Sequence, residues 1–225
     1  MGEEKRRQIL TSRYYDARKK KWNYEAFVRP CIPTVKTVNE EIEEWDKLVG
    51  YPEQERALRK LFVELCPRND SLEDILIKVS ALNDFYSTNI YKVLDVAKVI
   101  LELQIDSRLQ KDVLDAKIVD DIDARVKQVT GRSVYSFASK YCSHHRPDLY
   151  PIYDSYVDLL LRYYRDEAND ALFTFNDKDL KNYSGFCQAV EMFKKHYEIT
   201  QFDAKSIDKF LWLVGKKTFP KWKNE

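Results

Sequence analysis

Apolar residues recur along most of the chain at intervals of three and four. The clearest series runs from Ile90 to Leu101. Similar series lie in residues 71–86, 105–128, 134–141, 157–164, 186–193 and 207–214. This spacing places apolar side chains on one side of a helix with 3.6 residues per turn. No stretch of useful length alternates apolar and polar residues as a half-buried strand does. The pattern therefore predicts an all-α fold.

Capping residues and prolines mark the ends of several expected helices. Asn39 is expected to cap a helix that ends at Leu48, and Pro52 lies in the first turn of the next. Ser71 stands three residues before an acid, which is the spacing of a capping box. Gly215 follows the last apolar series, where a glycine commonly ends a helix.

The N-terminal segment differs from the rest of the chain in composition. Residues 1–30 are basic and rich in aromatic side chains, and we predict a helix over residues 3–27 whose aromatic side docks on the body. Prolines 30 and 33 then interrupt the helix. Residues 31–225 are expected to form a single helical domain. Two lobes are the alternative, one of residues 31–70 plus 165–225 and the other of residues 71–164.

The net charge of +1 hides basic ends on an acidic body. Residues 1–30 carry +5 and residues 205–225 carry +4, so residues 31–204 carry −8. Such ends either gather beside a groove and meet an anionic partner, or remain solvated and frayed. The terminal residues in question are Lys19, Lys20, Lys21, Trp22, Lys216, Lys217, Lys221, Trp222 and Lys223.

The four cysteines are scattered and form no C-x-x-C pair. We therefore expect no metal cluster, and we expect no metal or other cofactor elsewhere in the chain. His144 and His145 are expected to have a surface or capping role, with metal binding as the alternative. No apolar run is long enough to span a bilayer and no signal peptide is visible, so we expect no membrane partner and a cytoplasmic location with reduced thiols.

One acid stands at the expected start of a helix and merits separate attention. Asp154 follows a Tyr150–Tyr153 segment that contains a proline, and the apolar series from Val157 begins just after it. Backbone N–H groups and the helix dipole favour a negative charge at this place. Asp154 is therefore either an ordinary helix cap or a catalytic carboxylate. Phosphate-binding glycine loops, zinc-protease motifs and nucleophile elbows are absent from the sequence.

Two stretches resemble the helix-hairpin-helix DNA glycosylase superfamily. Residues 129–162, VTGRSVYSFASKYCSHHRPDLYPIYDSYVDLLLR, resemble its hairpin, the helix that follows, a short loop with a proline, and the helix that begins at an Asp. Residues 81–101, ALNDFYSTNIYKVLDVAKVIL, resemble its upstream helix pair. The resemblance implies a multi-helix fold of that architecture and a role in base excision repair, with duplex DNA as the partner.

The resemblance also implies roles for individual residues. Asp154 takes the position of the carboxylate that stabilises the cationic sugar or positions the attacking water. Ser136 takes the position of the lysine that forms a Schiff base in bifunctional members, which implies a monofunctional hydrolase. Lys140 lies one turn further along the helix and is the second choice of nucleophile.

The same resemblance places DNA contacts on two parts of the chain. The hairpin and its surroundings would meet the DNA backbone through Lys127, Thr130, Gly131, Arg132 and Arg146. Base flipping needs a wedge and a pocket, for which the candidates are Asn83, Tyr86, Asn89 and Tyr153. A helical interaction or scaffold protein without an active site is the alternative to a DNA-binding enzyme.

Overall fold

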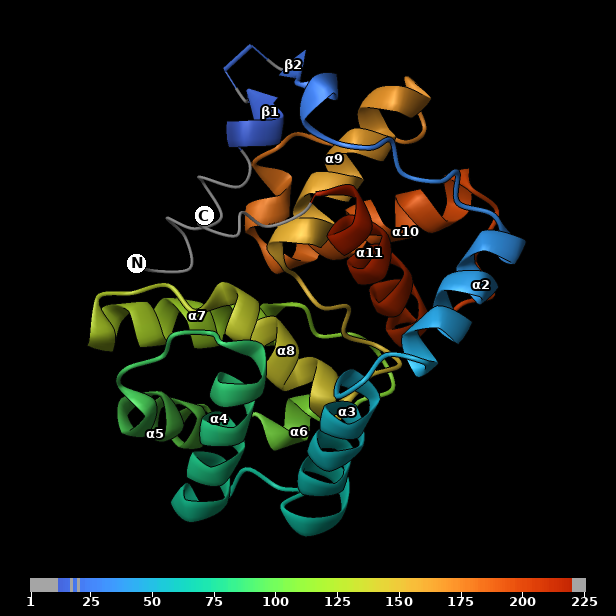
Figure 1. Cartoon of the computed structure of the whole chain (residues 1–225). Coiled ribbons are helices and arrows are strands. Elements are labelled where there is room, and N and C mark those ends of the chain that lie inside the picture. The colour runs from blue at the N-terminus through green and yellow to red at the C-terminus, as the bar shows by residue number, and fades with distance from the viewer. Residues whose placement is uncertain (1–11, 17, 20, 220–225) are drawn as a thin grey trace, which may run out of the picture. The chain divides into compact units, whose positions relative to one another are not determined.

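The computed structural model describes residues 12–16, 18, 19 and 21–219, and this part of the chain is mostly helical (Figure 1). The predicted all-α class is confirmed to that extent. The exception in the described part is an antiparallel pair of short strands, β1 (Tyr15–Asp16) and β2 (Lys21–Trp22), followed by the 3-10 turn η1 (Tyr24–Ala26). Residues 12–14 are helical, but where the chain is described the helix predicted over residues 3–27 does not continue past them. Lys20, Lys221, Trp222 and Lys223 lie outside the described residues.

The chain divides into two compact units. Unit 1 comprises residues 1–47, 154–181 and 185–225, and unit 2 comprises residues 48–153 and 182–184. The sequence-based lobes had their boundaries after residues 70 and 164, whereas the units have theirs after residues 47 and 153. Residues 48–70 thus belong with residues 71–153.

Unit 2 is built around one helix that is buried along nearly its whole length. Its elements are α3 (Tyr51–Arg59), the π-helical η2 (Lys60–Leu65), α4 (Leu72–Tyr86), α5 (Val93–Leu103), α6 (Asp106–Leu109), α7 (Lys117–Thr130) and α8 (Tyr135–His145). Helix α8 packs against α7, α4 and η2 (Figure 1). Residues 135–144 are all buried, although half of them are polar or charged. The single apolar stripe expected for this helix is therefore wrong.

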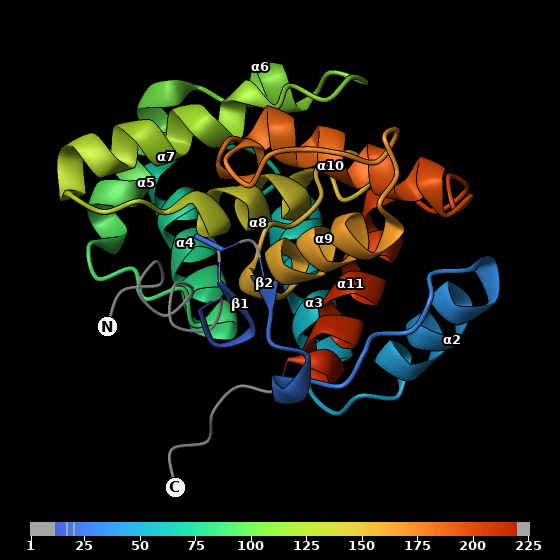
Figure 2. The same cartoon turned by 90° about the horizontal axis from the view of Figure 1, so that it is seen from above.

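Unit 1 contains α2 (Val35–Asp46), α9 (Ser155–Ala168), η3 (Asp179–Lys181), most of α10 (Tyr183–His196) and α11 (Ala204–Thr218). Helix α11 packs against both α2 and α9 (Figure 2). Helix α2 begins earlier than predicted, because Thr34 and Thr37 form its capping box and Asn39 lies inside the helix. The cap predicted at Ser71 is confirmed, since its side chain accepts a hydrogen bond from the amide of Asp74 at 3.3 Å.

Gly215 lies inside α11 and does not end it, which corrects the role expected from the sequence. A Cβ at this position would meet the Cβ of Tyr156 at 2.5 Å, well inside van der Waals contact. Gly215 therefore permits α11 and α9 to approach closely.

We predict that Gly215→Ala destabilises the protein. The alanine favours the helix by up to about 1 kcal/mol, but the clash with Tyr156 costs more than this gain. The net loss should be about 2 kcal/mol and should lower the melting temperature by roughly 4–8 °C. A melting temperature at or above that of the wild type would show that α9 and α11 do not meet at this glycine.

A fully buried lysine lies beside the C-terminal end of α8. Lys78 Nζ donates to the carbonyl of Arg68 at 2.8 Å and to Asn69 Oδ1 at 2.6 Å, and it lies 3.4 Å from His145 Nε2. Asn69 in turn donates to the carboxylate of Asp106. Burial lowers the pKa of Lys78 to about 8, although the negative charge of Asp106 opposes this shift. The Lys78 amine therefore loses its proton more readily in the folded chain than in the unfolded chain.

This difference predicts a pH-dependent stability. Between the folded pKa of about 8 and the ordinary lysine value, the unfolded state holds a proton that the folded state has lost, so stability rises with pH. From pH 7.5 to 9.5 the contribution of Lys78 to the free energy of unfolding should increase by about 2 kcal/mol. Urea titrations of wild type and Lys78→Met across this range measure it, because the variant lacks this contribution. Parallel pH profiles of the two proteins would contradict the assignment.

Candidate functional site

Asp154 caps α9, as the sequence predicted, with one of its two carboxylate oxygens. Its Oδ1 accepts from the amides of Tyr156 at 2.8 Å and Val157 at 2.9 Å. Its Oδ2 makes no hydrogen bond to any residue that the structure describes. The side chain is only half-buried. The carboxylate is thus oriented by the backbone and retains one oxygen for another partner.

The segment that leads to Asp154 is fixed inside unit 2. The Tyr183 hydroxyl donates to the carbonyl of Pro151 at 2.7 Å, and the rings of Tyr183 and Tyr150 stack with their centres 6.1 Å apart. The amide of Tyr153 donates to Ser139 Oγ on α8 at 3.0 Å. Residues 150–153 are therefore held in place within unit 2.

Ser136 and Lys140 lie one turn apart on α8, and the structure brings their side chains into contact. Lys140 Nζ donates to Ser136 Oγ at 2.5 Å and lies 3.5 Å from the carbonyl of Tyr153. Its ammonium group is 5.4 Å from the centre of the Tyr86 ring. Both side chains are buried, and no carboxylate of the described residues lies within ion-pair distance of Lys140. The lysine is satisfied by neutral groups. Both residues belong to unit 2, whereas Asp154 is the first residue of its segment of unit 1.

The turn between α7 and α8 is short and partly open. Gly131 ends α7 with a φ of 77°, and no atom lies within 4 Å of the position that a Cβ would occupy. The Thr130 hydroxyl accepts from the amide of Arg132 at 3.3 Å. The Arg132 side chain and that of Lys127, one turn earlier, are exposed. Backbone and cationic groups are thus accessible together at residues 127–132.

An acid occupies the other side of this turn. Asp123 Oδ1 accepts from the Ser133 hydroxyl at 2.8 Å and from the Val134 amide at 2.5 Å. Val134 is the residue before α8 begins, so its amide is one that a phosphate at this helix start would need. An anion can therefore approach the turn from residues 130–132 and not from Val134.

The corner between α4 and α5 is held by its own side chains. Asn83 Oδ1 accepts from the Thr88 hydroxyl at 2.8 Å and from the Ile90 amide at 2.9 Å. Its Nδ2 donates to the Ile90 carbonyl at 3.1 Å. Asn89 has a positive φ of 58° and donates to the carbonyl of Ser87 at 2.7 Å. The two asparagines stabilise the corner through these hydrogen bonds. Their amide groups, which would read a base, are therefore already occupied.

The two histidines of α8 are not on the surface. His144 is buried, and its Nε2 lies 3.0 Å from the hydroxyl of Tyr86. The rings of both histidines pack on Phe62. Burial, together with the charge of Lys78, holds the pKa of His145 well below its usual value. The expected surface or capping role is therefore wrong, and Tyr86 is engaged inside unit 2.

Arg146 and Tyr153 also have internal partners. Arg146 pairs with Asp148 and donates to the carbonyls of Leu109 at 3.1 Å and Lys111 at 2.7 Å. Tyr153 is 1% exposed, and its ring centre lies 4.6 Å from that of Tyr135. In this conformation a base cannot stack on the Tyr153 ring.

Sequence reasoning missed an exposed aromatic residue at the corner between α4 and α5. Tyr91 is 70% exposed, and the guanidinium carbon of Arg132 lies 5.2 Å from the centre of its ring. The neighbouring asparagines and threonine are conspicuous in the sequence because these residue types favour helix caps. The exposure of Tyr91 depends instead on the packing of α5 and α7. No pattern in the sequence carries that signal.

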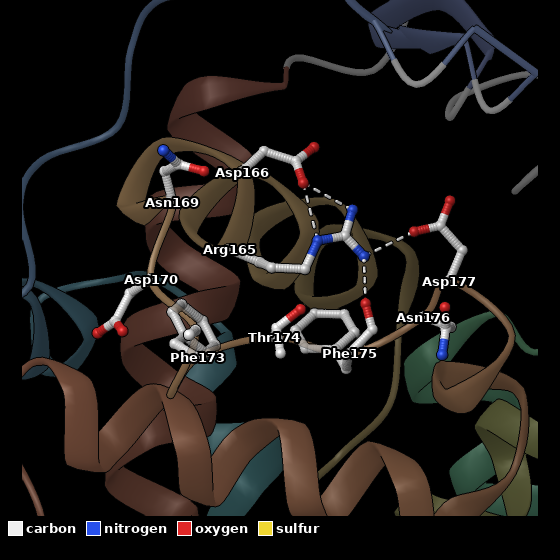
Figure 3. A pocket seen from close by; sticks show the side chains of 10 residues that line it. Arg165, Asp166, Asn169, Asp170, Phe173, Thr174, Phe175, Asn176 and Asp177 are labelled. Atoms are coloured by element: carbon white, nitrogen blue, oxygen red, sulfur yellow. Dashed lines mark hydrogen bonds and ion pairs between the residues drawn. The ribbon is translucent and has the colours of Figure 1, made fainter.

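Unit 1 contains a cavity of about 700 Å³ at the end of α9, which the sequence also did not indicate (Figure 3). Residues 165, 166, 169–171 and 173–177 line it. Arg165 pairs with Asp166 and Asp177 at 2.8 Å each and donates to the carbonyl of Phe175 (Figure 3). The second oxygen of Asp177 pairs with Arg162. The charged groups of this cavity are therefore largely matched by one another.

The described residues contain neither a membrane-spanning helix nor a cluster of metal-ligating side chains. No helix in residues 12–219 that the structure describes is both long and apolar enough to cross a bilayer. Within the same residues, no three His, Cys, Asp or Glu side chains converge as metal ligands would. The four cysteines are free thiols.

Comparison with known proteins places the chain in a family. The family model HI_0787_N, described as an N-terminal domain, matches residues 37–149. An uncharacterized protein of Haemophilus influenzae (strain ATCC 51907 / DSM 11121 / KW20 / Rd) is 40% identical over 154 residues, which are 68% of this chain and 72% of that protein. The chain therefore belongs to the HI_0787_N family. No solved structure matches it significantly. The matched region covers most of unit 2 and ends five residues before Asp154.

Proposed function

We propose that this protein binds DNA and acts as a monofunctional glycosylase, with Asp154 as its catalytic carboxylate. The observation that carries the proposal is the geometry of Asp154. Two backbone amides orient the carboxylate through Oδ1, and Oδ2 has no partner among the residues that are described. The order of elements gives further support, because α7, a turn at Gly131, α8 and a proline segment precede this acid.

The chemistry needs such a group. When the bond between a base and its sugar breaks, positive charge builds on the sugar, and a fixed carboxylate stabilises that charge. Asp154 would do this and would position the attacking water. Ser136 offers no amine, and the nearby Lys140 amine is held by Ser136 and the Tyr153 carbonyl. Hydrolysis by water is thus favoured over a Schiff-base mechanism.

The DNA backbone would meet unit 2 at the turn between α7 and α8. Lys127 and Arg132 are exposed there, and the open space beside Gly131 allows a phosphate to approach the main chain. The duplex would lie toward Thr130 and Arg132, because Asp123 already occupies the Val134 amide.

Duplex binding is the first test of this proposal. We expect affinity for a 20-base-pair duplex at about 50 mM salt and a loss of roughly tenfold or more at 200 mM, since two or three phosphate contacts release that many counterions. Fluorescence anisotropy over a salt series measures the slope. No binding at about 50 mM salt would remove the enzyme hypothesis and favour a helical interaction protein.

Asp154→Asn tests the catalytic role directly. Asparagine caps a helix about as well as aspartate, so the variant should remain folded while it loses the negative charge. Wild-type protein should release the base from at least one duplex in a panel, each with a single damaged or mismatched base. The variant should be slower by about 10²-fold or more in single-turnover assays of abasic sites.

The chain offers a matched control for this variant. Asp203 caps α11, its Oδ1 accepts from the Ser206 amide at 2.8 Å, and it lies in the same unit as Asp154. Asp203→Asn makes the same chemical change at a helix start and should keep full activity. Equal yields from wild type and Asp154→Asn would clear Asp154 of catalysis.

A further inference from the structure

Tyr91 and Arg132 come together on the surface of unit 2 from distant parts of the chain. Tyr91 lies at the corner between α4 and α5, and Arg132 lies in the turn between α7 and α8. Packing of α5 against α7 brings the two segments together, and the Arg132 guanidinium carbon lies 5.2 Å from the centre of the Tyr91 ring. Tyr91 is 70% exposed, so its ring is accessible to a ligand.

Neither side chain has an internal task among the described residues. Arg132 forms no ion pair there, and the Tyr91 hydroxyl forms no hydrogen bond. The pair of Tyr24 and Arg29 in unit 1 has a similar separation of 5.1 Å but a different environment. Glu167 accepts from the Tyr24 hydroxyl at 2.6 Å and lies 3.8 Å from Arg29. That pair holds its own unit together, whereas the groups of Tyr91 and Arg132 remain free for a partner.

The two segments that carry Tyr91 and Arg132 are basic. Residues 87–92 and 127–132 contain Lys92, Lys127 and Arg132 and no acid. All three basic side chains are exposed. Asp123, the acid beside the turn, is engaged by the Ser133 hydroxyl and the Val134 amide. The surface therefore offers an open aromatic ring among cations, which complements a flat ring attached to a negative charge.

An unpaired nucleotide in a nucleic-acid strand has both of these features. Its base stacks on aromatic rings, and its phosphate attracts arginine. We propose that Tyr91 stacks on an unpaired base of bound DNA while Arg132 contacts an adjacent phosphate. This inference rests on the proposed function, because it names the DNA structure that unit 2 recognises and the residues that recognise it.

The experiment compares two duplexes, one fully paired and one with a single unpaired thymine, by fluorescence anisotropy. Wild-type protein should prefer the duplex with the unpaired base. Tyr91→Ala should weaken binding to that duplex by roughly tenfold and remove the preference, since stacking is lost. Tyr91→Phe keeps the ring and should bind as the wild type does. Tyr24→Ala is the matched control and should leave both affinities unchanged.

Arg132→Gln provides a second, independent measurement. It should weaken binding to both duplexes by a similar factor and reduce the slope of log affinity against log salt by about one, because one phosphate contact is lost. Each substitution lies on an exposed side chain, and a melting curve checks that the variant is folded.

The outcomes separate this inference from the proposed function. Equal affinities of wild type and Tyr91→Ala for the duplex with the unpaired base would overturn the inference, and base release by the wild type would still support the glycosylase. Binding that depends on Tyr91 without any base release would support the inference and overturn the catalytic role. No binding of wild type to either duplex at about 50 mM salt would overturn both.

Discussion

A helix that is buried along nearly its whole length must satisfy its polar side chains inside the protein, and α8 imposes this requirement on unit 2. The Lys140 amine donates to Ser136 on the same helix, Ser139 accepts from the Tyr153 amide, and His144 meets the hydroxyl of Tyr86. The bonds of Ser139 and His144 also fix other segments, namely residues 150–153 and the end of α4. Loss of one partner would leave a buried polar group unsatisfied, which costs more than the bond itself contributes. The conformation of residues 150–153 within unit 2 therefore depends on the polar groups of α8.

Local signals in the sequence predicted the parts of the fold that local chemistry decides. The start of α9 at Asp154 and the cap at Ser71 were predicted correctly, because an N-cap needs only a short polar side chain and the amides that follow it. Gly215 was misinterpreted because a glycine that ends a helix and a glycine that admits a neighbouring helix look alike in sequence. The N-terminal hairpin was missed for a related reason. The Trp22 ring stacks on Phe219, almost two hundred residues away, and such a contact overrides local helix preference.

The candidate site could be predicted only in part. The position of Asp154 followed from its sequence context, but the burial of Tyr153 and the internal bonds of Asn83 did not, because they depend on which helices surround them. The polar corner between α4 and α5 was predicted correctly, whereas the internal hydrogen bonds of the asparagines proposed to contact a base there were not. Asparagines that favour turns use their amide groups to build the turn, and this leaves the less conspicuous Tyr91 as the exposed ring.

The discontinuous path of the chain has a consequence for how the protein is made. Unit 1 is assembled from three separate segments, the last of which begins at residue 185, whereas unit 2 lacks only residues 182–184 once residue 153 has left the ribosome. During synthesis the second unit can therefore form while the short strands and α2 still await their partners in unit 1, α9 and α11. Those elements include the aromatic hairpin, whose apolar rings remain exposed in the meantime. Truncation near residue 153 would prolong that exposure. Aggregation of nascent chains is therefore expected mainly after unit 2 has formed and before α9 and α11 have been synthesised.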